Sequence, residues 1–152
     1  MGGGEHHLDG EPGAGNLSSQ KLRPRPRAAR CGETQLPMSS VLAFLGDPAR
    51  YNPEELLVTA ISSCHVLWYL HLCVESRVVV AACEDCASGR LIVSTEDGGH
   101  FEAVTLRPNV TIEAGETEAA RRLHDCAHKK CFIASVNFPV FLEATILRVP
   151  LG

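Results

Sequence analysis

The sequence has no excess of positive charge, no hydrophobic leader and no internal repeat. Its 14 Lys and Arg residues stand against 18 Asp and Glu, and the formal net charge is -4. That balance gives no reason to expect a nucleic-acid partner. Nothing near the N-terminus resembles a secretory signal, and Glu5, Asp9 and Glu11 are acidic where a mitochondrial presequence avoids acid. We therefore expect no export signal and a cytoplasmic protein.

Hydrophobic residues are abundant by contrast, at 45% of the 152 residues. A chain of this length and composition is expected to build one domain with a real core. The chain also has seven cysteines, an odd number for a sequence without an export signal. We expect reduced thiols, metal ligands or redox groups rather than a disulfide framework.

The first 37 residues differ in composition from the remainder. They are rich in Gly, Pro and Arg and poor in aliphatic side chains. Segments of this kind cannot bury enough apolar surface to become ordered. We therefore predict a disordered arm over residues 1–37 and a folded domain over residues 38–152.

The longest apolar stretch, from Asn52 to Glu75, is predicted to form one helix. Asn52 is a favourable N-cap, Pro53 suits the first helical position, and Glu55 lies where a capping box needs an acid. The residues that follow leave almost no polar face, which is typical of a buried helix. The stretch is long enough to cross a membrane, but its Glu and His side chains would be costly in lipid. We interpret it as the central helix of a soluble protein.

The rest of the chain predicts strands and a second helix. Strand-like runs cover residues 78–82 and 91–95, an alternating strand covers 100–114, a helix covers 117–130, and a last strand covers 140–149. This order predicts an α+β domain.

Two cysteines stand out by position. Cys64 lies in the middle of the long helix, and Cys131 directly follows the second helix. Taken alone, each is more often a small buried hydrophobic residue than a reactive thiol. His65 projects away from Cys64 and is interpreted, like His71, as a core or interface histidine, while Trp68 lies one turn after Cys64 and either lines a pocket or packs in the core.

A rival interpretation uses other side chains as metal ligands. Cys83 and Cys86 form a CxxC pair, and His124 and His128 face the same side of the second helix. Together they are a chemically reasonable tetrahedral zinc set. The two pairs are farther apart in sequence than in a zinc finger, and Cys83 is equally compatible with ordinary core. We therefore favour a site without metal.

The chain resembles the OsmC/Ohr family of organic hydroperoxide reductases in the segments NPEELL, SSCH and HKKCFI and in the strand near the C-terminus. The resemblance covers about residues 44–149, and SSCHVLWYLHLC is most similar to the OsmC-like branch. It implies an OsmC-like fold in which a long buried central helix and a second helix pack on an antiparallel sheet.

The resemblance also implies a peroxiredoxin-like thiol peroxidase with an antioxidant role in the oxidative stress response. Cys64 matches the peroxidatic cysteine, whose thiolate would attack an organic hydroperoxide, release the alcohol and become a sulfenic acid. Cys131 matches the resolving cysteine, which would condense with it to a disulfide. A dithiol, in this family typically of the dihydrolipoyl type, would reset the pair without metal or organic cofactor. The resemblance also implies a homodimer.

Glu54 matches the family glutamate that pairs with a catalytic arginine, although an acid there also suits the first turn of any helix. The family's arginine lies in an N-terminal strand, and the corresponding window here is KLRPRPRAAR, whose prolines disfavour a strand. Arg23, Arg25 and Arg27 lie in that window, but none aligns with the family's arginine. Arg50 lies near Glu54 and could substitute for it, although an arginine there is more often a surface charge. We therefore expect the N-terminal hairpin to be altered or missing. The alternative function is that of a non-catalytic OsmC-fold module, which binds a partner or an apolar ligand in the pocket that holds the peroxide in the family.

Overall fold

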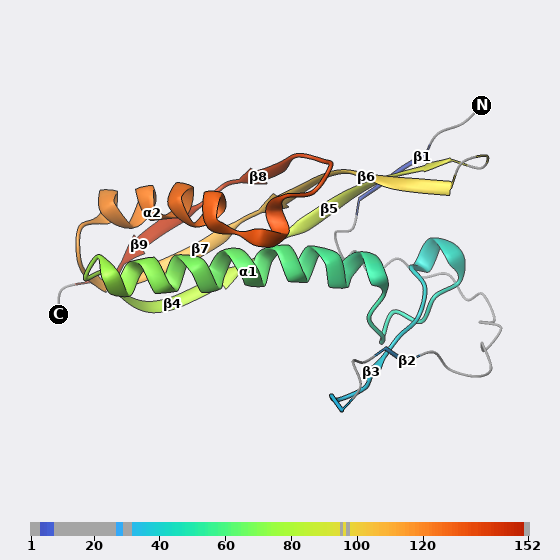
Figure 1. Cartoon of the computed structure of the whole chain (residues 1–152), viewed down its shortest axis with the longest axis horizontal. Coiled ribbons are helices and arrows are strands. Elements are labelled where there is room, and N and C mark those ends of the chain that lie inside the picture. Colours follow the sequence, from blue (N-terminus) through green and yellow to red (C-terminus); the bar gives the residue numbers. More distant parts are fainter. Residues whose placement is uncertain (1–3, 8–26, 29–31, 95, 97, 151–152) are drawn as a thin grey trace. The chain divides into compact units, whose positions relative to one another are not determined.

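The structure is a computed structural model that describes residues 4–7, 27–28, 32–94, 96 and 98–150 (Figure 1). The chain divides into two compact units. One comprises Met1–Leu8 with Val58–Gly152, and the other comprises Asp9–Leu57.

Helix α1 spans Pro53–Glu75, which confirms the long predicted helix. Asn52 caps it as expected, because Asn52 Oδ1 accepts a hydrogen bond from the Glu55 backbone N–H at 2.8 Å. The C-terminal end is closed by Arg77, which has a left-handed φ of 58°. The Val78 N–H then bonds the Cys73 carbonyl at 2.9 Å, so the last turn ends in a Schellman motif without a glycine.

The larger unit contains two sheets. Two segments that were each predicted as one strand, residues 100–114 and 140–149, are divided between these sheets. One sheet has the order β1–β5–β6–β8 and the other the order β4–β7–β9. Their strands are β1 (Gly4–His7), β4 (Val79–Asp85), β5 (Ser88–Ser94), β6 (Gly98–Leu106), β7 (Pro108–Ala114), β8 (Val140–Leu142) and β9 (Thr145–Arg148). The β6–β8 and β7–β9 pairs are parallel. Both sheets are therefore mixed, and the expectation of an antiparallel sheet is wrong at these pairs.

The predicted strand over residues 100–114 is two strands, because the chain leaves the first sheet at Arg107. The Arg107 backbone N–H bonds Asp85 Oδ1 at 2.7 Å instead of a neighbouring strand. Pro108 comes next and has no N–H to donate. The predicted last strand is likewise divided into β8 and β9, one in each sheet.

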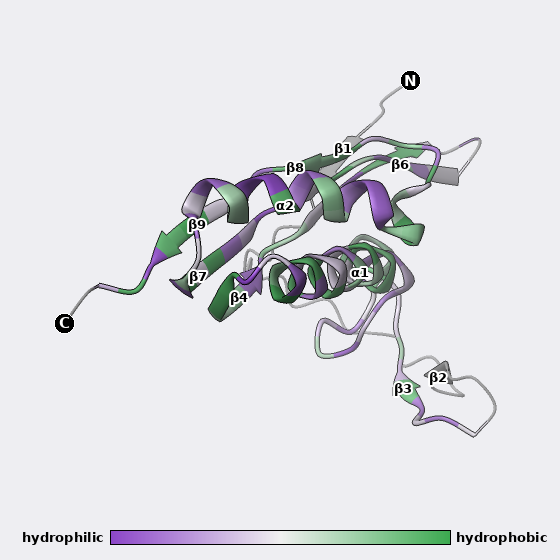
Figure 2. Cartoon of the chain, turned by 60° about the vertical axis from the view of Figure 1, so that its left-hand side comes forward, coloured by the Kyte–Doolittle hydropathy of each residue, from purple (hydrophilic) through white to green (hydrophobic). Residues whose placement is uncertain are grey.

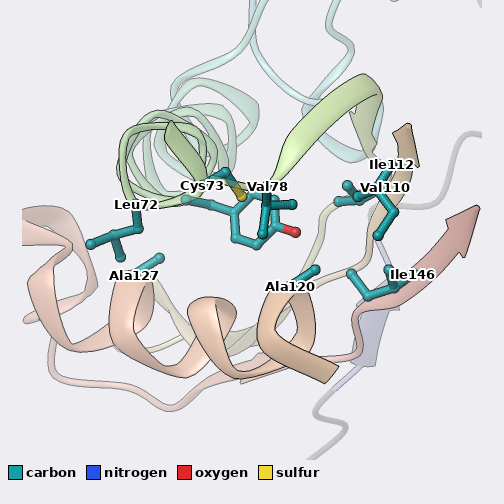
Figure 3. Packing of buried hydrophobic residues seen from close by; sticks show 9 residues of the cluster. Leu72, Cys73, Val78, Val110, Ile112, Ala120, Ala127 and Ile146 are labelled. Carbon is teal, nitrogen blue, oxygen red and sulfur yellow. The ribbon is translucent and has the colours of Figure 1, made fainter. Parts of the chain in front are cut away.

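Helices α1 and α2 (Thr117–Lys130) pack against the β4–β7–β9 sheet. Figure 3 shows Leu72 and Cys73 of α1, Ala120 and Ala127 of α2, and three strand residues pointing toward one another. The cluster of buried residues is Tyr69, Leu72, Cys73, Val78, Val110, Ile112, Ala120, Ala127 and Ile146. The two alanines let α2 approach closely, which brings the C-terminal end of α2 beside the middle of α1.

Only one face of α1 is buried in the chain, so the expectation of all-round burial is wrong. Leu67 and Val74 are 69% and 78% exposed on the other face. Figure 2 shows many hydrophobic residues along α1, whereas α2 is mostly hydrophilic in this view. By length and composition α1 is the one helix of the described residues that could cross a membrane, and 33% of its most apolar window is buried. The core helix of a soluble protein meets the same criterion.

Short strands occur inside the predicted arm. Strand β1 pairs with β5, while β2 (Arg27–Ala28) and β3 (Leu36–Pro37) pair antiparallel with each other in the smaller unit. The structure therefore gives these segments a regular backbone. The prediction of disorder stays a prediction for residues 1–3, 8–26 and 29–31, which lie outside the described residues.

Candidate active site

The two singled-out cysteines come together although they lie on different helices. Cys64 is half-buried in the middle of α1, and Cys131 is buried directly after the last turn of α2. The Cys131 thiol donates a hydrogen bond to the Cys64 sulfur. Both thiols are free. Sequence reasoning singled out both residues but gave no distance between them, because their contact depends on how α1 and α2 pack.

The surroundings of Cys64 favour its thiolate. Burial alone raises the pKa of Cys64, but hydrogen bonds from the Cys131 thiol and from the backbone N–H groups of Ile133 and Phe132 outweigh it. The pKa of Cys64 therefore lies below its ordinary value. The backbone donors belong to η2, a 3-10 turn over Phe132–Ala134 that begins where α2 ends. A thiolate held by a neighbouring thiol and two backbone N–H groups is the reactive form of a cysteine.

Cys131 is shifted in the opposite direction. Burial, and then its hydrogen bond to Cys64, raise the pKa of Cys131 to about 11. At neutral pH this cysteine is therefore a protonated thiol that donates, while Cys64 accepts. The site thus has one thiol whose lowered pKa favours the nucleophilic thiolate, and beside it a second thiol whose raised pKa keeps it protonated.

Apolar side chains lie next to the pair. The Trp68 ring meets the Phe132 ring edge-on with the centroids 6.1 Å apart, and Lys130 Nζ lies 5.3 Å from the Trp68 centroid. Phe132 is 78% and Ile133 is 40% exposed, so this rim faces outward. The placement of Trp68 beside the residue that follows Cys131 supports the interpretation that it lines the site.

The pairing of Glu54 with an arginine stays a prediction. Glu54 lies in the first turn of α1, within the smaller unit. Arg50, the nearby substitute, has its Nε 3.1 Å from Asp47 Oδ2. Arg23 and Arg25 lie outside the described residues, and Arg27 belongs to the short strand β2.

The rival zinc site has no geometric support. Within the described part of the chain, no three or more His, Cys, Asp or Glu side chains are grouped so as to hold a metal ion. Cys83 packs against the core cluster, where burial raises its pKa, while Cys86 is exposed.

His124 of that zinc set instead pairs with His65. His65 Nε2 and His124 Nδ1 are 3.0 Å apart, and both rings are buried, at 0% and 1% exposure. His65 is therefore a core histidine, as interpreted. The His65–His124 contact was missed because it joins α1 to α2, and neither helix alone shows it.

Asp85 fixes the same part of α1 to the strands. Its Oδ2 accepts a hydrogen bond from Ser62 Oγ at 2.7 Å, and its Oδ1 accepts from the Arg107 N–H at 2.7 Å. Arg107 Nη1 also reaches Ser88 Oγ at 2.8 Å. This network holds α1 in place two residues before Cys64.

Comparison with solved structures shows the same fold. An OsmC-like protein of unknown function from Vibrio cholerae superposes with a TM-score of 0.74 at 24% identity, covering 95% of this chain and 99% of the other. An organic hydroperoxide resistance protein OsmC from Legionella pneumophila gives 0.58 at 16% identity, covering 76% and 83%. A further organic hydroperoxide resistance protein, from Elizabethkingia anophelis, gives 0.59 at 19% identity, covering 78% and 84%.

No curated protein matches this sequence. The model of the OsmC-like protein family matches residues 46–140, which include α1, Cys64, α2 and Cys131. The match covers more than half of the chain and both helices of the candidate site. The chain therefore belongs to the OsmC-like protein family.

Proposed function

We propose that this protein is a thiol peroxidase that reduces organic hydroperoxides, with Cys64 as the nucleophile and Cys131 as the resolving thiol. One observation carries the proposal: the Cys64 sulfur accepts hydrogen bonds from the Cys131 thiol and from the Phe132 and Ile133 backbone, so its pKa lies below its ordinary value. The family is linked to peroxide detoxification, and two structural relatives are organic hydroperoxide resistance proteins.

The chemistry follows from the opposite tuning of the two thiols. The Cys64 thiolate attacks one peroxide oxygen, the O–O bond breaks, and the leaving alkoxide takes a proton to become the alcohol. Cys64 is then a sulfenic acid. Cys131 attacks that sulfur, forming the Cys64–Cys131 disulfide and releasing water. An external dithiol, for which we propose the dihydrolipoyl type, exchanges with the disulfide and is itself oxidised to a cyclic disulfide.

The rim around Trp68 supports an organic substrate. Trp68, Phe132 and Ile133 present apolar surface next to the pair, with Phe132 and Ile133 open to the outside. An alkyl group that covers such surface gains free energy in proportion to the area removed from water, about 25 cal/mol per Å². Hydrogen peroxide has no such group and gains nothing there.

We also propose that the protein works as a homodimer in the cytoplasm. Leu67 and Val74 form an exposed apolar stripe on α1, at 69% and 78% exposure. A second copy of the chain is the occupant that we propose for this stripe, since exposed apolar area marks interaction sites.

Single-turnover reaction with cumene hydroperoxide tests the peroxidase proposal. Wild type should lose two thiols and gain one intramolecular disulfide at one equivalent of peroxide. Cys131→Ser should stop at a trapped sulfenic acid, and Cys64→Ser should not react. Cys126→Ser, which removes an exposed thiol of α2, serves as the matched control and should behave as wild type. Equal, slow oxidation of all cysteines would refute the proposal and favour the non-catalytic module.

A further inference from the structure

We propose that His65 and His124 form a neutral imidazole pair that positions the two thiols, by fixing the turn of α1 that carries Cys64 against the turn of α2 that leads to Cys131. The inference deepens the proposed function, because it concerns the same site. His65 follows Cys64 directly along α1. His128, one turn after His124, accepts the Cys131 N–H at its carbonyl at 3.3 Å.

The geometry identifies an end-to-end hydrogen bond. The two rings are within 5° of parallel, and their centroids are 5.3 Å apart. The N–N distance of 3.0 Å is shorter than the spacing of stacked rings, so the rings do not lie face to face. One ring N–H must therefore point at the bare nitrogen of the other ring.

This bond accepts one protonation state only. His65 Nε2 and His124 Nδ1 can share one proton; a second would place two N–H groups against each other. Tyr69 stacks on one face of the His124 ring with centroids 3.8 Å apart and planes within 7°. Both histidine rings are buried, and their bond is a polar link between the buried faces of α1 and α2.

The remaining ring nitrogens show why the pair depends on this link. His65 Nδ1, His124 Nε2 and His128 Nδ1 are buried and have no hydrogen-bond partner among the described residues. No carboxylate or carbonyl there fixes either tautomer. Each paired ring therefore has one hydrogen bond, and losing it leaves two further buried polar atoms unsatisfied.

The charged and titratable groups that act on the pair come from two elements, β4 and α2. Asp85 at the end of β4 favours a charged His65, whereas His128 disfavours it, and Arg121 of α2 disfavours a charged His124. Burial, the largest influence on both rings, also favours the neutral form and lowers both pKa values, to about 4 and about 3. The pair is therefore neutral where the Cys64 thiolate forms.

The pH profile of Cys64 alkylation by iodoacetamide tests the inference without peroxide, so it can fail independently of the proposed peroxidase. His65→Leu and His124→Leu remove the bond and should raise the alkylation midpoint of Cys64 by about one pH unit, because the Cys131 and η2 donors move away. The double variant His65→Gln with His124→Asn places amide atoms near the paired nitrogens and should return the midpoint to wild type. His71→Gln, an exposed histidine of α1, should leave it unchanged.

Two results would overturn the inference. One is a wild-type midpoint in both Leu variants, and the other is failure of the folded Gln–Asn double variant to restore it. Should the Leu variants not fold, nitrogen NMR of the wild-type rings decides instead. A shared N–H requires both rings to be neutral at pH 6 and to hold the same tautomer. Opposite tautomers, or a charged ring, would contradict the pair.

Discussion

The buried histidine pair should make the protein progressively less stable as the pH falls below about 6.5, and the size of the effect can be worked out. Burial lowers the pKa of His65 from 6.5 to about 4 and that of His124 to about 3. As the pH falls, the unfolded chain binds protons near 6.5 while the folded pair stays neutral. The stabilisation is therefore complete above 6.5 and is lost progressively toward pH 4.

Between pH 7 and pH 5 each histidine should cost about 2 kcal/mol of unfolding free energy, or about 4 kcal/mol for the pair. Urea unfolding of wild type at pH 7, 6 and 5 measures this loss. The His65→Gln and His124→Asn double variant has no titratable pair. Its free energy of unfolding should therefore fall by about 4 kcal/mol less than that of wild type over the same pH range. Parallel curves for the two proteins would refute the reasoning, because every other titrating group is common to both.

Three further predictions concern positions outside the thiol pair. Asp85→Ala removes the acceptor of the Ser62 hydroxyl and the Arg107 N–H, and should lower the free energy of unfolding by about 2 kcal/mol in thermal melts; an unchanged melting temperature would show that water replaces both bonds. Gly115 has a φ of 102°, and an added Cβ would lie 2.9 Å from Val78 Cα, so Gly115→Ala should lower the free energy of unfolding by at least about 1 kcal/mol. Gly32 has a φ of 85° but open space around it, so Gly32→Ala should lower the free energy of unfolding by less. Leu67→Glu should turn the proposed homodimer into monomers in sedimentation velocity while Glu55→Gln, an exposed change on the same helix, should not; a dimeric Leu67→Glu variant would place the interface elsewhere.

Local patterns predicted the helices well because both carry their own signals. Asn52 and Pro53 mark the start of α1, and the alanine stripe of α2 marks its inner face. The strands were harder, since nothing in the run from residue 100 to 114 shows that Arg107 bonds Asp85 and divides the run between two sheets. The extent of burial of α1 was overestimated for a related reason. An all-apolar helix indicates contacts on every side but not that the same chain supplies them.

The candidate site was likewise predictable from the sequence only in part. Cys64 and Cys131 stand out by their positions in the sequence, and the family resemblance implies their roles. His124 stands out by its spacing from His128. Its partner His65 could not be assigned, because the contact depends on the packing of α1 against α2. The donors from η2 were missed because backbone N–H groups leave no trace in side-chain patterns.

The electrostatics of the Cys64–Cys131 pair imply that Cys131 helps to stabilise the Cys64 thiolate before it forms the disulfide. Its thiol donates to Cys64, so the nucleophile depends on a reduced Cys131 for part of its stabilisation, in addition to the N–H groups of η2. These donors lie next to Cys64 and do not belong to the N-terminal window that would supply the family's arginine. Cys131→Ser keeps a hydroxyl donor and should nearly retain the alkylation midpoint of Cys64, whereas Cys131→Ala removes the donor and should raise it. Equal midpoints in the two variants would show that the backbone alone holds the thiolate, and Cys131 would then serve only to form the disulfide.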